Sequence, residues 1–260
     1  MMSNLGVFIE SKISAIPESC DLSNLLNLFL AIAQSQSLVV SIPIILTWTK
    51  LLRSPIIGGS SFITPLIAPL LELSSSRLIR YENMLDDCED PEFLFLQEDI
   101  DTQPERHAFL GNYRRYCSQI IELVVRQKQS EAIYHILSQV DNSLQHLYDG
   151  CPPFSGSLPL PLSPPNFKSQ LIDPILVENY SKTSIAVLRV DKNFTVVEAA
   201  LKGYMKWRAG HGSDPQRDVI THTARLAHPA DYPQEQERTS IEDNLETWCQ
   251  RLLELKFEVC

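Results

Sequence analysis

The feature that most constrains the fold is a pattern of apolar residues at helical spacing, interrupted by short turn signals at roughly 20-residue intervals. The second of these stretches shows the i, i+3, i+4, i+7 spacing of one helix face at Leu22, Leu25, Leu26 and Phe29. The chain has only 9 glycines in 260 residues, which disfavours the tight turns of hairpin-rich β structure. The sequence therefore predicts an all-α fold built of paired helices.

Helix boundaries follow from the apolar pattern together with capping residues and prolines. Asp21 or Ser23 would cap the second helix, and Pro43 would either kink the third helix or mark its start. Ser130 would cap a later helix that Gly150 closes. Predicted helices cover approximately residues 1–15, 22–33, 38–53, 61–81, 104–127, 130–149, 171–188, 191–207, 216–226 and 239–257. The residues alone leave open whether these helices build a bundle or a solenoid.

Prolines and serines concentrate at residues 151–170, where Cys151–Asn166 reads CPPFSGSLPLPLSPPN. This composition cannot form a regular helix and predicts an exposed loop. The loop divides the chain into two helical regions, residues 1–150 and 171–260. It is either an insertion between helical repeats or a Pro-rich ligand for a partner domain.

Residues 81–105 contain ten acidic residues and no basic one. The segment also holds the apolar run Phe93–Leu96, which predicts an acidic loop with one short helix fixed to the protein surface. The spacing of an EF-hand is missing. The segment is therefore either a solvated loop or a docking site for a basic partner or a basic groove of the same protein. The candidate contact residues are Asp86, Asp87, Glu89, Asp90, Phe93 and Phe95.

Basic residues gather on two predicted helices. Arg114 and Arg115 lie on the first, and Lys202 and Lys206 share a face of the second at i, i+4 spacing. RNA phosphates are able to lie along such faces, although a solvated helix surface has the same composition. The net charge of −10 argues against nucleic-acid binding through bulk charge.

Catalytic and cofactor motifs are missing from the sequence. It has no GxSxG nucleophile elbow, no P-loop and no GxGxxG fingerprint. The cysteines show no CxxC spacing, and the cluster of His211, His222 and His228 indicates a polar loop rather than a metal site. The most apolar segment, Leu38–Leu52, is too short to span a bilayer. We expect no enzyme activity, no cofactor and no membrane insertion.

Four long stretches point to a family. They read SLVVSIPIILTWTKLLRSP, FITPLIAPLLELSSSRLIRYENM, EDPEFLFLQEDIDTQPERHAFLGNYRRYCSQIIELVV and VLRVDKNFTVVEAALKGYMKWRAGHG, in this order. Together they resemble fungal members of the exportin-5 family, which are karyopherin-β nuclear transport receptors. The similarity covers most of residues 22–210.

The resemblance implies an α-solenoid of HEAT-like antiparallel helix pairs, with such repeats over residues 1–150 and 171–260. It implies a nuclear export receptor that binds protein or structured RNA cargo together with GTP-bound Ran, contacts nuclear pore proteins and shuttles between nucleus and cytoplasm. Family members are several times longer, so we expect an internal region that lacks the amino-terminal repeats making the main Ran contacts. No Ran-contact residue is assigned on this basis.

Three readings of the chain follow from these points. In the first reading, the chain is a fragment of such a receptor, a truncated form of it or a divergent short paralogue. In each of these cases it acts as a binding scaffold. Alternatively, it is a free-standing helical interaction module or adaptor whose Pro-rich loop recruits a partner. An all-α enzyme would need a closed pocket of converging polar groups, for example around His211 and Asp214.

Overall fold

The computed structural model describes residues 8, 12, 21–58, 60–84, 88–146, 185–212 and 244–255. Throughout these ranges the regular structure is helical, without a strand, which confirms the predicted all-α class. No helix in the described part of the chain is long and apolar enough to cross a membrane. The helices expected at 1–15 and 216–226 and the Pro-rich loop at 151–170 lie outside the described residues, apart from Phe8 and Lys12.

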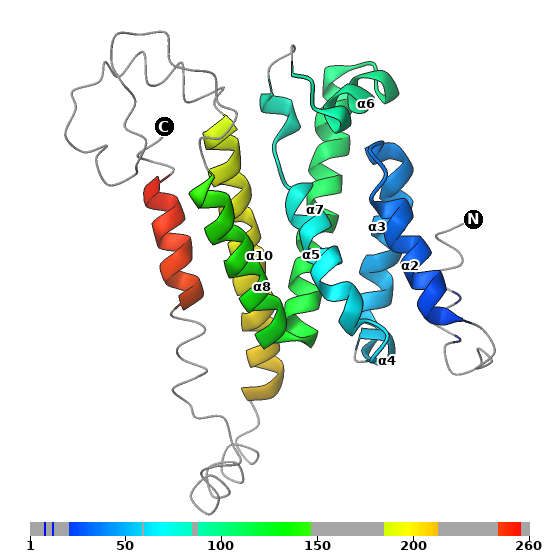
Figure 1. Cartoon of the computed structure of the whole chain (residues 1–260), viewed down its shortest axis with the longest axis vertical. Coiled ribbons are helices and arrows are strands. Elements are labelled where there is room, and N and C mark those ends of the chain that lie inside the picture. The colour runs from blue at the N-terminus through cyan, green and yellow to red at the C-terminus, as the bar shows by residue number, and fades with distance from the viewer. Residues whose placement is uncertain are drawn as a thin grey trace, which may run out of the picture.

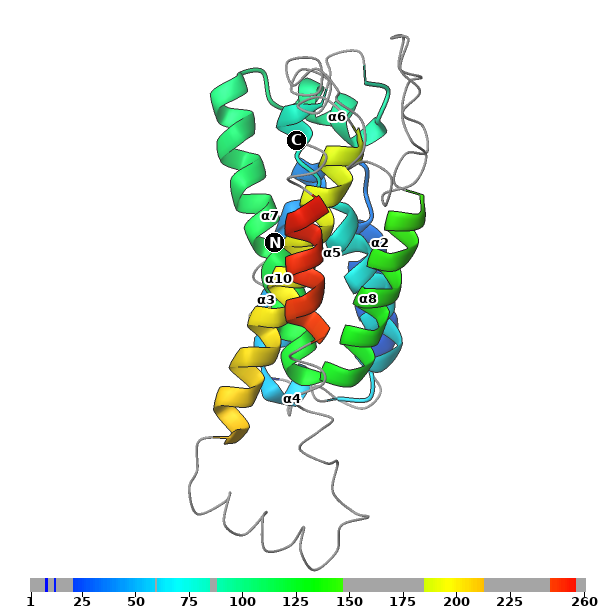
Figure 2. The same cartoon turned by 90° about the vertical axis from the view of Figure 1, so that its left-hand side faces the viewer.

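Six helices form two layers. One layer contains α2 (Leu22–Ala33), α5 (Ile67–Ser76) and α8 (Gln129–Gln145). The second layer contains α3 (Leu38–Arg53), α7 (Gln103–Gln127) and α10 (Ile185–Gly212). Figure 2 shows the two layers on opposite sides of the molecule.

The layers are built from helix pairs that stack in chain order. Helix α2 packs on α3, α5 on α7 and α8 on α10, and each pair also packs against the next one along the chain. In Figure 1 the three pairs lie side by side. One hydrophobic core runs through all of them. This is the solenoid-like arrangement predicted for HEAT-like repeats, and it decides against a closed bundle.

Shorter elements lie between the long helices. They are α4 (Pro55–Gly58), η2 (Thr64–Leu66), η3 (Tyr81–Asn83) and α6 (Pro91–Asp99). Helix α6 is inserted between α5 and α7 in the chain and lies at the top of Figure 1, at the ends of the long helices and next to α3. Residues 244–255 form a last helix whose Leu255 packs on a small cluster at Ala186 and Val190 of α10.

Helix starts follow local capping chemistry. The Asp21 carboxylate accepts the backbone N–H of Asn24 at 2.9 Å, which makes Asp21 and not Ser23 the cap of α2. Thr102 caps α7 and donates its hydroxyl hydrogen to Glu105 at 2.7 Å. Pro43 lies inside α3, which begins at Leu38.

Three predicted boundaries were wrong. The helix expected over residues 61–81 is only α5, preceded by η2, and it ends at three serines. There the Ser76 hydroxyl donates to the Leu73 carbonyl at 2.8 Å and competes with the helical hydrogen bond. Residues 55–58, which no predicted helix covers, form the short α4. Helix α8 begins at Gln129 without a side-chain cap from Ser130.

Two helices were expected at 171–188 and 191–207. Residues 171–184 lie outside the described part of the chain, and from residue 185 onward the two expected helices are continuous as α10. The sequence suggested a new start at Asp191. In the structure, Val190 and Asn193 on either side of it are buried, and Asn193 donates to the Ser143 hydroxyl of α8 at 3.0 Å. Tertiary packing therefore overrides the local capping signal.

The backbones of α7 and α10 approach closely at a glycine. A Cβ atom added to Gly203 would lie 2.6 Å from the carbonyl oxygen of Glu122. The preceding turn of α10 has the small buried residues Ala199 and Ala200. Because these residues are small, α10 packs on α7 along much of its length.

We predict that Gly203→Ala destabilises the fold by about 1–3 kcal/mol, since the added methyl group would force α10 away from α7. Gly210→Ala on the same helix is the matched control, because nothing lies within 4 Å of its added Cβ. The control should stabilise the chain by about 0.5–1 kcal/mol through helix propensity. Urea unfolding of both variants measures the difference, and a Gly203→Ala variant as stable as the control would contradict the close packing.

A buried arginine attaches α6 to the stack. The Arg77 side chain follows α5 and is 4% exposed. Its guanidinium lies 2.8 Å from the Glu92 carboxylate of α6 and donates to the Ser35 carbonyl, between α2 and α3, at 2.9 Å. Burial raises the pKa of Glu92 above its ordinary value, while the Arg77 charge acts in the opposite direction. One side chain thus joins α6 to two helix pairs.

Further contacts fix α6 in position. Phe93 and Leu96 are buried against the core. The Asp90 carboxylate caps the helix by accepting the Phe93 N–H at 3.0 Å. At the other end, the Ser37 hydroxyl donates to the Asp99 carboxylate at 2.6 Å and joins α6 to the start of α3.

We predict that Arg77→Met lowers the free energy of unfolding by about 3 kcal/mol, because it leaves a half-buried carboxylate without its cation. Arg115→Met is the control: Arg115 is exposed and lies over the Tyr116 ring at 4.9 Å, so its loss should cost about 0.5 kcal/mol or less. Thermal and urea unfolding distinguish the two variants. Equal stabilities would show that Arg77 does not hold α6.

Candidate functional site

The carboxylates of the acidic segment that face the protein are engaged. Glu82 of η3 lies 2.6 Å from the Arg114 guanidinium of α7. Glu92 pairs with Arg77, and Asp99 accepts the Ser37 hydroxyl. These acidic residues are therefore part of the fold, and the short helix predicted within the acidic segment is α6, with Phe93 and Leu96 buried.

The carboxylates on the outward side differ. Glu89, Glu98 and Asp101 are exposed, and none has an ion pair or a side-chain hydrogen bond within the described part of the chain. Between them, α6 presents Leu94 (44% exposed) and Phe95 (39% exposed) to solvent. We call these five residues the α6 outer face. An apolar pair bordered by free carboxylates is suited to contacts with a basic, partly apolar partner.

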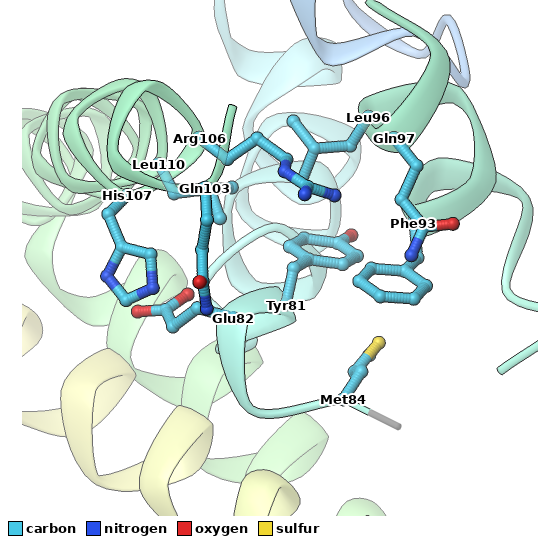
Figure 3. A pocket seen from close by; sticks show the side chains of 10 residues that line it. All are labelled: Tyr81, Glu82, Met84, Phe93, Leu96, Gln97, Gln103, Arg106, His107 and Leu110. Carbon is cyan, nitrogen blue, oxygen red and sulfur yellow. The ribbon is translucent and has the colours of Figure 1, made fainter. Parts of the chain in front are cut away.

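A pocket of about 230 Å³ lies on the opposite side of α6, between η3, α6 and the start of α7 (Figure 3). Ten residues line it: Tyr81, Glu82, Met84, Phe93, Leu96, Gln97, Gln103, Arg106, His107 and Leu110. Figure 3 shows the Tyr81 and Phe93 rings next to each other. The Gln103 and His107 side chains of α7 lie to the left of these rings, near Glu82. Burial raises the pKa of Tyr81, so its hydroxyl stays protonated at neutral pH. The Nε atom of Arg106 is buried without a hydrogen-bond partner in the described residues.

This pocket has the lining of a small binding site. Its aromatic and aliphatic side chains would contact an apolar group of a ligand. Its amide and guanidinium groups would orient that ligand through hydrogen bonds. The Glu82 carboxylate that borders it is already paired with Arg114. No nucleophile with an adjacent base lines the pocket.

The acidic candidate residues fall into different environments. Asp86 and Asp87 lie outside the described residues. Glu89 is exposed, whereas Asp90 caps α6.

The two candidate phenylalanines lie on opposite sides of α6. Phe93 is buried and borders the pocket, while Phe95 points outward. Sequence reasoning missed Leu94, because in the run Phe93–Leu96 every residue is apolar and the pattern does not identify the outer face.

The basic candidate residues are largely neutralised by neighbouring carboxylates. Arg114 pairs with Glu82, and Arg115 donates to the side chains of Asn112 and Tyr116. These contacts leave Arg115 as the more accessible of the two arginines.

On α10, Lys202 pairs with Glu198 at 2.9 Å, and Lys206 pairs with Glu122 of α7. The Glu198–Lys202 pair could have been found from its i, i+4 spacing. The Glu122–Lys206 pair joins residues far apart in the sequence, and no local signal indicates it. These lysines therefore do not form a concentrated positive surface.

A metal site has no support in the described part of the chain, where no group of three or more His, Cys, Asp or Glu residues converges. His222 and His228 of the predicted histidine cluster lie outside the described residues. Cys88, Cys117 and Cys249 are free thiols.

Comparison with known proteins gives two findings. The sequence model of the Exportin-5 family matches residues 1–258. The Schizosaccharomyces pombe protein C328.01c, described as uncharacterized, is 28% identical over 233 residues. The aligned region makes up 89% of this chain but only 16% of that relative, so the chain corresponds to a small part of its length. The family match extends along almost the whole chain, and the chain therefore belongs to the exportin-5 family.

Proposed function

We propose that this chain is a segment of a nuclear export receptor that binds protein or structured RNA cargo together with GTP-bound Ran. Membership of the exportin-5 family indicates a nuclear transport receptor rather than an enzyme. The observation that carries the proposal is the family match over residues 1–258, on a chain whose described helices stack in pairs.

The architecture suits this work. A stack of helix pairs offers long exposed surfaces, and its partners bind by shape and reversible contacts. Such a receptor would not hydrolyse nucleotide itself. It would contact nuclear pore proteins and shuttle between nucleus and cytoplasm.

Within this proposal, residues 1–150 and 171–260 act as two blocks of HEAT-like repeats joined by the Pro-rich segment 151–170. Partner contacts come from the acidic segment, through Asp86, Asp87, Glu89 and Phe95, while Asp90 and Phe93 hold α6 in place. Arg114, Arg115, Lys202 and Lys206 are a second set of contacts, on the neighbouring helices α7 and α10. The internal ion pairs of Arg114, Lys202 and Lys206 would have to exchange for contacts with the partner.

A free-standing helical adaptor is the second candidate. The exposed pair Leu94 and Phe95 favours it, since an outward apolar patch serves any protein–protein contact. An adaptor would bind its partner without regard to Ran. The nucleotide state of Ran therefore separates the two candidates.

We predict that cargo capture by the receptor rises about tenfold or more when Ran carries a non-hydrolysable GTP analogue instead of GDP, because cargo and Ran bind cooperatively. The assay is a pull-down with this chain and, in parallel, with the full-length Schizosaccharomyces pombe relative, which supplies the repeats outside the matched region. Protein and double-stranded RNA cargoes are tested side by side.

Nucleotide-independent capture by both proteins would favour the adaptor. Failure of the full-length relative to bind Ran in either state would rule out the receptor proposal.

A further inference from the structure

The acidic residues around α6 separate into two groups by the direction they face. Those that face the stack are neutralised, as in the Glu82–Arg114 and Glu92–Arg77 pairs. Those that face solvent, Glu89, Glu98 and Asp101, have no cation partner among the described residues. The fold therefore uses the inner carboxylates and leaves the outer ones uncompensated.

The same division holds for the apolar residues of α6. Phe93 and Leu96 face inward and are buried, while Leu94 and Phe95 point outward. A surface helix normally buries one apolar stripe and exposes a polar one. Helix α6 has apolar residues on both sides, and the stack covers only the inner side.

The outer face is held in place before any partner binds. Arg77 at Glu92, the Asp90 cap and the Ser37–Asp99 hydrogen bond fix α6 along its length. A preorganised surface loses little conformational entropy on binding. This distinguishes the α6 outer face from an acidic tail that would have to become ordered.

The apolar surface continues toward α3. The Ser37–Asp99 hydrogen bond joins the end of α6 to the start of α3. Phe95 lies four residues before Asp99, and the exposed Val39 and Val40 lie in the first turn of α3, which Ser37 caps. An extended or helical segment lying across this junction would reach both sets of apolar side chains.

We propose that the α6 outer face binds a basic, partly apolar peptide segment of a protein partner. Two bulky apolar side chains of that segment pack on Leu94 and Phe95, and its Lys or Arg residues lie against Glu89, Glu98 and Asp101. This rests on the proposed receptor function and names the cargo class at this surface as protein. RNA does not fit here, because its phosphates would approach uncompensated carboxylates.

Three basic residues on the helices α7 and α10 are not available to cover this face. Arg114, Lys202 and Lys206 are already paired with carboxylates of their own or neighbouring elements. The charge complementarity therefore favours a segment from a partner.

The test uses the whole 260-residue chain and three fluorescent probes: an amphipathic peptide of leucine and lysine, the same peptide with glutamate in place of lysine, and a double-stranded RNA hairpin. Anisotropy titrations measure binding. We expect the basic peptide to bind, with an affinity that falls as ionic strength rises. Leu94→Ser with Phe95→Ser should weaken this binding about tenfold, and Glu98→Gln with Asp101→Asn about threefold.

The matched control is Glu131→Gln with Tyr134→Ser on α8, which removes an exposed carboxylate and a side chain that is 80% exposed. It should leave peptide affinity unchanged. Because the substituted residues are exposed, the melting temperatures should stay equal. If the Leu94/Phe95 variant has a lower melting temperature than the natural chain, the peptide affinity of the Glu98/Asp101 variant, which alters no buried atom, tests the proposal instead.

Equal affinity in the α6 variants and the control, equal binding of the acidic peptide, displacement of the basic peptide by RNA, or no peptide binding at all would each overturn the proposal. Ran-dependent cargo capture is measured separately, so the receptor function can hold while this surface fails.

Discussion

Arg77 is a buried cation at the point where three parts of the chain meet. From the end of α5 it contacts Glu92 of α6 and the Ser35 carbonyl between α2 and α3. Removing a guanidinium from water is costly, and the Glu92 carboxylate and the Ser35 carbonyl offset part of this cost, so both must be in place for α6 to be held against the stack. The position of α6 follows from this contact, together with the burial of Phe93 and Leu96. The outward direction of Leu94 and Phe95 is a consequence of the same anchoring.

The second constraint is the central place of α7. This helix packs against α3, α5, α8 and α10, and it lies closest to α10, where Gly203 removes the side chain that would separate the backbones. The buried Tyr113 of α7 shares a hydrogen bond of 2.7 Å with Ser41 of α3, which joins the same helix to the first pair. The core is thus continuous from the first helix pair to the last.

Local signals in the sequence were sufficient for much of this fold. Helix α3 has the predicted bounds, and α7 starts one residue before the predicted Pro104, because caps and apolar spacing act within a few residues of each other. The sequence did not show which carboxylates are neutralised. The Glu82–Arg114 pair joins residues 32 positions apart, and the Lys206–Glu122 pair joins residues 84 apart. Such pairs depend on the tertiary fold. The exposed carboxylates could therefore be distinguished from the paired ones only from the structure.

The α6 outer face can bind a partner as proposed only if α6 is a fixed part of the stack and presents this face to solvent. Amide hydrogen exchange followed by mass spectrometry tests this directly in the free chain and in the Arg77→Met variant. We expect the amides of α6 to be protected in the natural chain and to lose protection in the variant, while those of α7 stay protected in both. Rapid exchange of α6 in the natural chain, at the same rate as in the variant, would contradict the account.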